Sequence, residues 1–321
     1  MPYITRNYSQ NVVHLTDVRI SNWKVMALVN VDAENRKLSV AQSDYISYYN
    51  TCQRLSYIVA KTVNDSSEKG DDEDSIIDRL KGIVPNPNDL SNRVASIGVC
   101  TLTVFYNVEG DDNPEAYMII HHRGNKVAEA MNTRSLVPAG GLQINNAKTH
   151  KNYETTIDET SIVNNTVREF EEEVMGRPEV IEPAEYDYVE NSHLCESFMK
   201  IYYCTMGYDP LSLKVEMITF LAIDCHNPDF ERYVYEMKPS LLLEDEKDKT
   251  DGFINRSGLK KIVTQGIADE GRITIDRFSD EMVCRYENDV GAMPVMRECM
   301  RYVHKYRSKI SEIVNGQFPG I

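Results

Sequence analysis

The sequence has no apolar run that approaches the roughly eighteen residues of a membrane span, and its N-terminal segment lacks the apolar core of a secretory signal peptide. It also has no Cys-x-x-Cys pair, which argues against a structural zinc site of the usual thiolate kind. The cysteines number seven and are widely scattered, as expected for reduced thiols. We therefore expect a cytoplasmic protein without a membrane partner.

Positive charge is also scarce, since 35 Lys and Arg residues face 50 Asp and Glu residues. A net charge of −15 argues against general nucleic-acid binding, which normally requires a basic surface. An anionic small molecule is not excluded, because a bound metal and a few local Arg or Lys side chains can reverse the field within a site.

The chain of 321 residues is long enough for two domains, or for one domain with an extension. Strand-like alternation over 12–31 is followed by a helical pattern over 42–63, whose tyrosine-rich face is more typical of a core than of a binding surface. The polar, acidic run 64–75 predicts a loop or linker, and 75–84 predicts a short helix. Residues 1–90 thus form an N-terminal α/β extension or a small accessory domain.

After residue 90 the sequence becomes rich in β-branched and aromatic residues. The pattern predicts a hairpin of two strands, 97–106 and 116–123, then strands at 185–189, 199–206 and 215–225 and a helix at 257–263. These elements place one domain over 91–275. The tail, 276–321, predicts one or two helices, which either pack on their own core or form a dimer contact.

The acidic stretch Arg168–Gly176 is the strongest functional signal. On a helix, Glu169, Glu172 and Glu173 fall within an arc of roughly 100°, beside an apolar stripe. Such neighbouring carboxylates repel one another unless a positive charge lies among them, and Mg²⁺ prefers oxygen ligands of this kind. The alternative is an acidic helix face that is merely solvated. The apolar stripe comprises Ile162, Val163, Thr166, Val167, Phe170 and Val174.

The run Arg168-Glu169-Phe170-Glu171-Glu172-Glu173 resembles the helical half of the Nudix box, and Pro138-Ala139-Gly140-Gly141 is similar to the turn that opens that box. The loop half is longer here: seventeen residues separate Gly141 from Glu159, where the family has five. Eight residues separate Glu159 from Arg168 instead of seven, and Gly176 comes one residue late. A polar insertion at 145–156 is easily absorbed by a loop, because closure entropy grows slowly with length.

The resemblance implies an α+β fold, namely an α/β/α sandwich with a mixed sheet. It also implies hydrolysis of a diphosphate linkage in a nucleoside diphosphate derivative, with Mg²⁺, or alternatively Mn²⁺, activating water. The implied metal ligands and catalytic groups are Glu169, Glu172 and Glu173, with Glu159 as a further ligand and Arg168 orienting a glutamate. Arg123, Gly140 and Gly141 are the expected substrate contacts.

Two rival functions remain open from the sequence. The first is a Nudix-fold sensor or regulator that binds a nucleotide with little or no hydrolysis. The second is an interaction protein that does not bind metal. The nucleotide, its leaving group, the oligomeric state and the role of residues 1–90 are not determined by these patterns, because specificity in such folds resides in loops and extensions.

Overall fold

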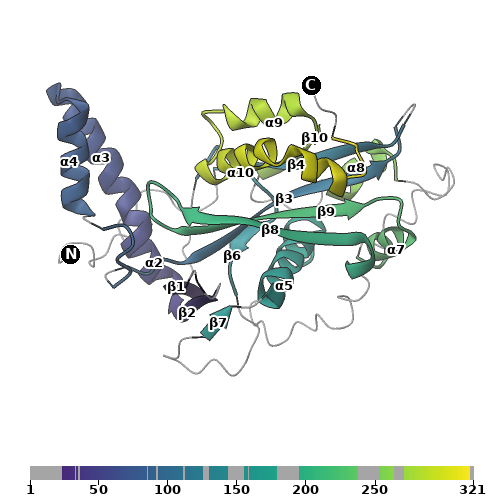
Figure 1. Ribbon diagram of the computed structural model, residues 1–321, viewed down its shortest axis with the longest axis horizontal. Coiled ribbons are helices and arrows are strands. Elements are labelled where there is room, and N and C mark those ends of the chain that lie inside the picture. The colour runs from purple at the N-terminus through teal and green to yellow at the C-terminus, as the bar shows by residue number, and fades with distance from the viewer. Residues whose placement is uncertain are drawn as a thin grey trace. The chain divides into compact units, whose positions relative to one another are not determined.

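A computed structural model of the chain describes residues 24–32, 34, 37–84, 86–91, 93–110, 113–125, 130–143, 155–157, 159–178, 195–237, 254–263 and 271–318 (Figure 1). The start of the predicted strand region 12–31, most of the insertion 145–156 and the strand predicted at 185–189 lie outside these residues.

Contacts within the chain divide it into two compact units. The first comprises residues 1–98, 141–161 and 206–216, and the second comprises 99–140, 162–205 and 217–321. The domain limits expected at residues 90 and 275 remain predictions.

Among the described residues, the larger sheet has seven strands in the order β10-β4-β3-β9-β8, with β5 paired to β4 and β6 to β3. Strand β4 is antiparallel to both β3 and β10. The amide of Val215 donates to the carbonyl of Ser96 (3.1 Å) and that of Cys225 to the carbonyl of Tyr106 (2.9 Å), so β9 runs parallel to β3. The sheet is therefore mixed. The strands are β3 (Ile97–Val108), β4 (Glu115–Arg123), β5 (Arg134–Ser135), β6 (Ala139–Gly141), β8 (Met199–Tyr208), β9 (Val215–Asp224) and β10 (Gly271–Arg277).

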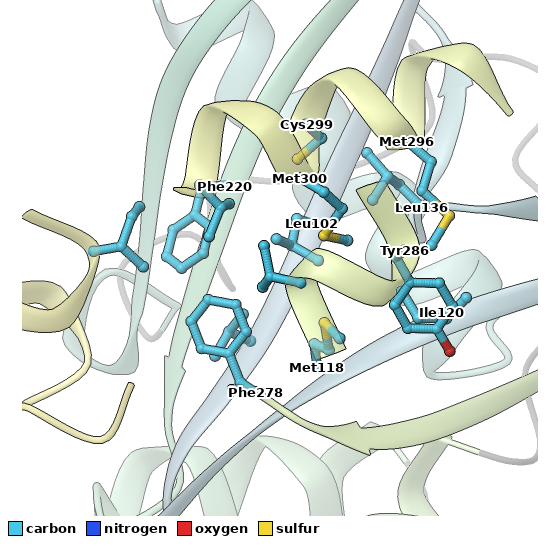
Figure 2. Packing of buried hydrophobic residues seen from close by; sticks show 14 of the residues in the cluster. Leu102, Met118, Ile120, Leu136, Phe220, Phe278, Tyr286, Met296, Cys299 and Met300 are labelled. Carbon is cyan, nitrogen blue, oxygen red and sulfur yellow. The ribbon is translucent and has the colours of Figure 1, made fainter. Parts of the chain in front are cut away.

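Helices cover both faces of this sheet. Successive side chains of each strand point to opposite sides, and both sides carry apolar residues that the helices bury. Phe105 and Ile119 pack with the helix that carries the acidic stretch and with two later helices. Leu102 and Met118 pack with the C-terminal helices (Figure 2). The predicted α+β class with a mixed sheet between helices is thus confirmed. The helices on the first face are α5 (Glu159–Glu169), the π-helical turn η2 (Phe170–Val174), α7 (Pro228–Met237) and α8 (Arg256–Val263); those on the second are α9 (Asp280–Glu287), α10 (Pro294–Lys305) and α11 (Arg307–Ile313).

The C-terminal helices belong to the core, as one of the two alternatives left by the sequence predicts. Met296 and Met300 of α10 are fully buried against the sheet, and Phe278, just before α9, stacks on Phe318 with ring centroids 4.4 Å apart. Ser279 begins α9, since its hydroxyl accepts a hydrogen bond from the amide of Met282 (3.4 Å). These helices pack on their own sheet.

In the first unit a smaller sheet, in the order β1-β2-β7, accompanies a nearly continuous helical segment. The helix predicted from residue 42 begins at Tyr45, because Asp44 still belongs to a strand and caps the helix by accepting from the amide of Ser47 (2.9 Å). Tyr48 and Tyr49 are buried, as expected for a core stripe. The elements are β1 (Lys24–Asp32), β2 (Lys37–Asp44), β7 (Thr155–Ile157), α2 (Tyr45–Tyr48), the π-helical turn η1 (Tyr49–Gln53), α3 (Arg54–Lys69) and α4 (Glu73–Ile83).

The prediction of a loop over 64–75 was wrong. Helix α3 continues to Lys69, where Gly70 closes it in the left-handed conformation (φ 72°), and α4 begins at Glu73. Local contacts explain this outcome: Lys61 pairs with Asp65 (3.1 Å), and Asp72 caps α4 by accepting from the amide of Ser75 (2.9 Å). Polar composition alone did not reveal these helix-stabilising pairs.

Several described elements of the second unit were not predicted, among them α7 and β10. Helix α7 buries Phe230, Tyr233 and Val234 along one side, and β10 pairs along its full length with Tyr117–Arg123 of β4. Within the described part of the chain, every helix is too short or too polar to cross a lipid bilayer.

Truncation of the core side chain Phe278 tests this packing. Phe278 is fully buried, and its ring lies 6.2 Å from that of Phe220 and 4.4 Å from that of Phe318. We expect Phe278→Ala to lower the free energy of unfolding by about 3–5 kcal/mol, measured by urea denaturation. The control Val290→Ala, at a side chain that is 94% exposed, should change it by less than about 0.5 kcal/mol. Equal effects of the two substitutions would contradict the assigned core.

Candidate functional site

The acidic stretch lies on α5 and on the π-helical turn that follows it. Phe170 and Val174, the first and last residues of that turn, are fully buried against the sheet and anchor the helix. Val163 was predicted to join the buried stripe, but it is 38% exposed, whereas Val167, one turn later on the same side of the helix, is buried. A π-turn adds one residue to a helical turn and thereby redirects the side chains that it carries.

Arg168 lies at the centre of the acidic residues and is only 2% exposed. Its Nη1 donates to Oε2 of Glu172 (2.7 Å), and its Nη2 donates to Oε1 of Glu169 and to Oδ1 of Asn165 (3.2 Å). Such charge-assisted hydrogen bonds fix the carboxylates as well as neutralising one negative charge. One guanidinium thus holds two of the three glutamates predicted to bind metal.

The helix also contacts β6, the turn that the sequence likened to the opening of the box. Oε2 of Glu173 accepts a hydrogen bond from the amide of Ala139 (2.7 Å). The carboxylate of Glu169 lies so close to Gly140 that a Cβ added there would overlap it. Glu169 and Glu173 therefore meet two consecutive residues of β6, and a side chain at position 140 would have to displace the Glu169 carboxylate.

The other predicted site residues lie as follows. Gly141 is the exposed last residue of β6. Arg123 ends β4, where its amide donates to the carbonyl of Thr133 (2.9 Å). Glu159 begins α5, but its side chain lies outside the described part of the structure. Roles in substrate or metal binding for these three residues remain predictions.

No group of three or more His, Cys, Asp or Glu side chains is arranged to hold a metal among the residues that the structure describes. In this structure the three glutamates accept hydrogen bonds from Arg168 and from the Ala139 amide. Their chemistry nevertheless suits a hard cation, because three carboxylates and one guanidinium leave two negative charges on this side of the helix.

Glu171 is a feature that sequence reasoning did not assign. Its carboxylate is 1% exposed, accepts a hydrogen bond from the hydroxyl of Tyr233 (3.0 Å) and pairs with the guanidinium of Arg177 (2.7 Å). Burial raises the pKa of Glu171, although the hydrogen bonds from Arg177 and Tyr233 act in the opposite direction. The position of Glu171 next to the apolar residues of the helix was a sign that its side chain is buried. Its partner on α7, Tyr233, could not be identified from spacing.

No family model matches this sequence, and no curated protein matches it either. Among solved structures, the chain is similar to a mutT/nudix family protein from Listeria innocua, with 11% sequence identity and a TM-score of 0.33. The similarity covers 68% of this chain and 97% of that chain. At this level of identity and overlap, the site has to be judged from its own contacts.

The two adjacent glycines of β6 provide a matched test of the contact with Glu169. We expect Gly140→Ala to lower the free energy of unfolding by about 1–3 kcal/mol, because the new methyl group displaces the Glu169 carboxylate. Gly141→Ala should change it by less than about 0.5 kcal/mol, since its added Cβ meets no described atom within 4 Å. Urea denaturation of both variants measures the difference. Equal stability would show that Glu169 does not lie against Gly140.

The buried acid Glu171 predicts a dependence of stability on pH. Its pKa is higher in the folded chain than the ordinary value of 4.5, so its contribution to stability is complete below that pH and is lost as pH rises through the folded pKa. Glu171→Gln does not titrate, so its stability relative to the wild type should rise as the pH increases above 4.5. Urea denaturation at a series of pH values measures this difference.

For a second variant, stability relative to the wild type should fall with rising pH instead of increasing. Tyr233→Phe removes a hydrogen bond that lowers the pKa of Glu171, so the loss of stability with rising pH should become larger than in the wild type. A difference between Glu171→Gln and wild type that stays constant or falls with pH would show that burial of the charge does not dominate.

Proposed function

We propose that this chain hydrolyses a diphosphate linkage in a nucleoside diphosphate derivative, as Nudix enzymes do, and that Glu169, Glu172 and Glu173 hold Mg²⁺ or Mn²⁺. The observation that carries the proposal is the convergence of Glu169 and Glu173 on the backbone at 139–140. It joins the two halves of the motif that the sequence separates by a long insertion.

The donor set supports a hard divalent cation. The side chains offer carboxylate oxygens, and the two negative charges left after pairing with Arg168 equal the charge of one such ion. Arg168 contacts Oε1 of Glu169 and Oε2 of Glu172, so the second oxygen of each carboxylate would be the one to bind the ion. When bound, the cation would offset charge on the phosphates and lower the pKa of a water molecule.

Other residues of the chain would position the metal ligands and the phosphate of the substrate. Arg168 orients Glu172 through one hydrogen bond and so limits where its carboxylate can reach. Gly140 and Gly141 present backbone without side chains, which allows a phosphate to approach closely. Arg123 is the proposed phosphate contact, because its planar guanidinium can form two parallel hydrogen bonds to phosphate oxygens. Glu159 is proposed as an additional metal ligand.

Two observations bear on the rival functions. The buried carboxylates of Glu169 and Glu171 do not fit an acidic helix face that is merely solvated, which weakens the case for an interaction protein. A sensor that binds a nucleotide without hydrolysis remains the second candidate. It is supported by the lengthened loop half of the box and by the additional unit that contains residues 1–98.

Hydrolysis assays test the proposal directly. Nucleoside diphosphate sugars, dinucleotides and nucleoside triphosphates are incubated with and without Mg²⁺, and release of phosphate-containing products is measured. We expect turnover that depends on Mg²⁺ and that falls on the order of 100-fold or more in the double variant Glu172→Gln plus Glu173→Gln. The control is Glu236→Gln plus Glu298→Gln, which removes the same charge at exposed positions and should leave turnover unchanged.

The possible results separate the three functions. Nucleotide binding without turnover in the wild type would favour the sensor. Absence of turnover, of nucleotide binding and of any Mg²⁺-dependent rise in the unfolding temperature would favour the interaction protein, because a ligand that binds only the folded state must stabilise it. Equal turnover in wild type and the Glu172/Glu173 variant would refute the assigned carboxylates.

A further inference from the structure

The first unit contains a cavity of about 770 Å³. Its walls come from strands β1 and β2, from residues 88–91, 93 and 94, and from Tyr208 at the end of β8. This volume lies within the range of about 300–1,000 Å³ typical of small-molecule sites. None of its lining residues belongs to the acidic helix, so the proposed hydrolase site does not account for it.

One wall of the cavity is formed by a cation–π pair, Arg93 and Tyr208. The guanidinium of Arg93 lies over the ring of Tyr208, with its central carbon 5.5 Å from the ring centroid. The same guanidinium donates to the carbonyl oxygen of Asp89 (2.9 Å) and to that of Pro87, which hold it in place. A planar, pre-positioned surface of this kind suits an aromatic ligand, because a second flat ring can stack on it at little entropic cost.

The polar groups around this wall are mostly neutral. Asn30, Gln42, Ser43 and Asn88 line the cavity, and amide and hydroxyl side chains can both donate and accept hydrogen bonds. Side-chain amides in particular can form two parallel hydrogen bonds with the edge of a heterocyclic base. The lining therefore has the groups needed to bind such an edge.

The charged side chains of the cavity give an anion no net attraction. Of the described residues that line the cavity, Arg93 and Asp89 are charged, and they have opposite signs. The Asp89 carboxylate accepts hydrogen bonds from both the amide (3.0 Å) and the hydroxyl (2.6 Å) of Ser91, which lower its pKa and keep it ionised. A phosphate group entering the cavity would meet this negative charge in a chain whose net charge is −15.

The backbone of β1 is irregular at the same place. The pairing with β2 shifts between Leu28 and Asn30, which leaves Val29 as an extra residue, and both Val29 and Asn30 line the cavity. Such bulges change the direction of the side chains that follow them. Val31, also on the wall, is an exposed apolar side chain that a ring could cover.

We infer that this cavity binds a neutral heterocyclic compound of nucleoside size. Its ring stacks on the surface formed by Tyr208 and Arg93, and the amide side chains bind its polar edge. The inference goes beyond the proposed hydrolase activity, because a nucleoside has no diphosphate to cleave.

Binding of adenosine, guanosine, cytidine and uridine to the full chain tests this inference by saturation-transfer NMR and calorimetry. At least one nucleoside should bind saturably to the wild type. Tyr208→Ala should weaken its binding about tenfold by removing the stacking surface, whereas Tyr208→Phe, which keeps the ring, should change it less than about twofold. The matched control Tyr203→Ala alters an exposed tyrosine of the same strand and should bind like the wild type. The corresponding nucleoside monophosphate should bind more weakly than the nucleoside.

Two results would overturn the assignment. One is the absence of saturable binding of all four nucleosides at about 1 mM to a folded wild type. The other is binding that Tyr208→Ala leaves unchanged but Glu172→Gln plus Glu173→Gln abolishes, which would place the nucleoside at the carboxylate site. Thermal unfolding of each variant verifies that it is folded, and Gln42→Ala, which removes an amide from the opposite strand, should also weaken binding. Failure of the hydrolysis assay leaves these results unaffected.

Discussion

The turn Phe170–Val174 has to bury two apolar side chains while it carries three glutamates, and the contacts of the candidate site follow from that constraint. Burial of Phe170 and Val174 against the sheet also buries most of the neighbouring glutamate side chains, and a buried ionised carboxylate is costly unless it is paired. Each glutamate accordingly has a partner: Arg168 for Glu172, Tyr233 and Arg177 for Glu171, and the Ala139 amide for Glu173. The polar network is therefore a consequence of packing the helix on the sheet.

The two-sided sheet determines where this helix can lie. Strands β3, β4 and β9 alternate their side chains between two cores, one formed with η2 and α7 and the other with α10 (Figures 1 and 2). Strand β6, which pairs with β3, carries Ala139 and Gly140 to the acidic helix. The long connection between β6 and α5 does not prevent this contact, because the sheet holds one partner and the core holds the other. A lengthened loop is thus compatible with an intact site.

Much of the fold follows from local composition. The β-branched and aromatic runs of β3, β4 and β9 and the helical spacing of α10 are strong signals, since each element is buried on a repeating set of positions. Elements with weaker patterns were missed or misjudged. Strand β10 alternates charged and apolar residues and acquires its structure by pairing with β4, and the acidic end of α3 is held by side-chain pairs and by the capping glycine Gly70. Polarity alone did not separate these segments from loops.

The sequence by itself determined which acidic residues share one helix, and the resemblance to the Nudix box gave Arg168 the role of orienting a glutamate. Helical geometry makes that result local, because side chains one to four positions apart have few relative placements. Only the tertiary structure decided that Glu173 meets Ala139, 34 residues away, and that Glu171 meets Tyr233, 62 residues away. It also decided that Arg93 and Tyr208 form one wall of a cavity. Contacts between residues so far apart depend on the path of the whole folded chain, and no spacing within one segment encodes them.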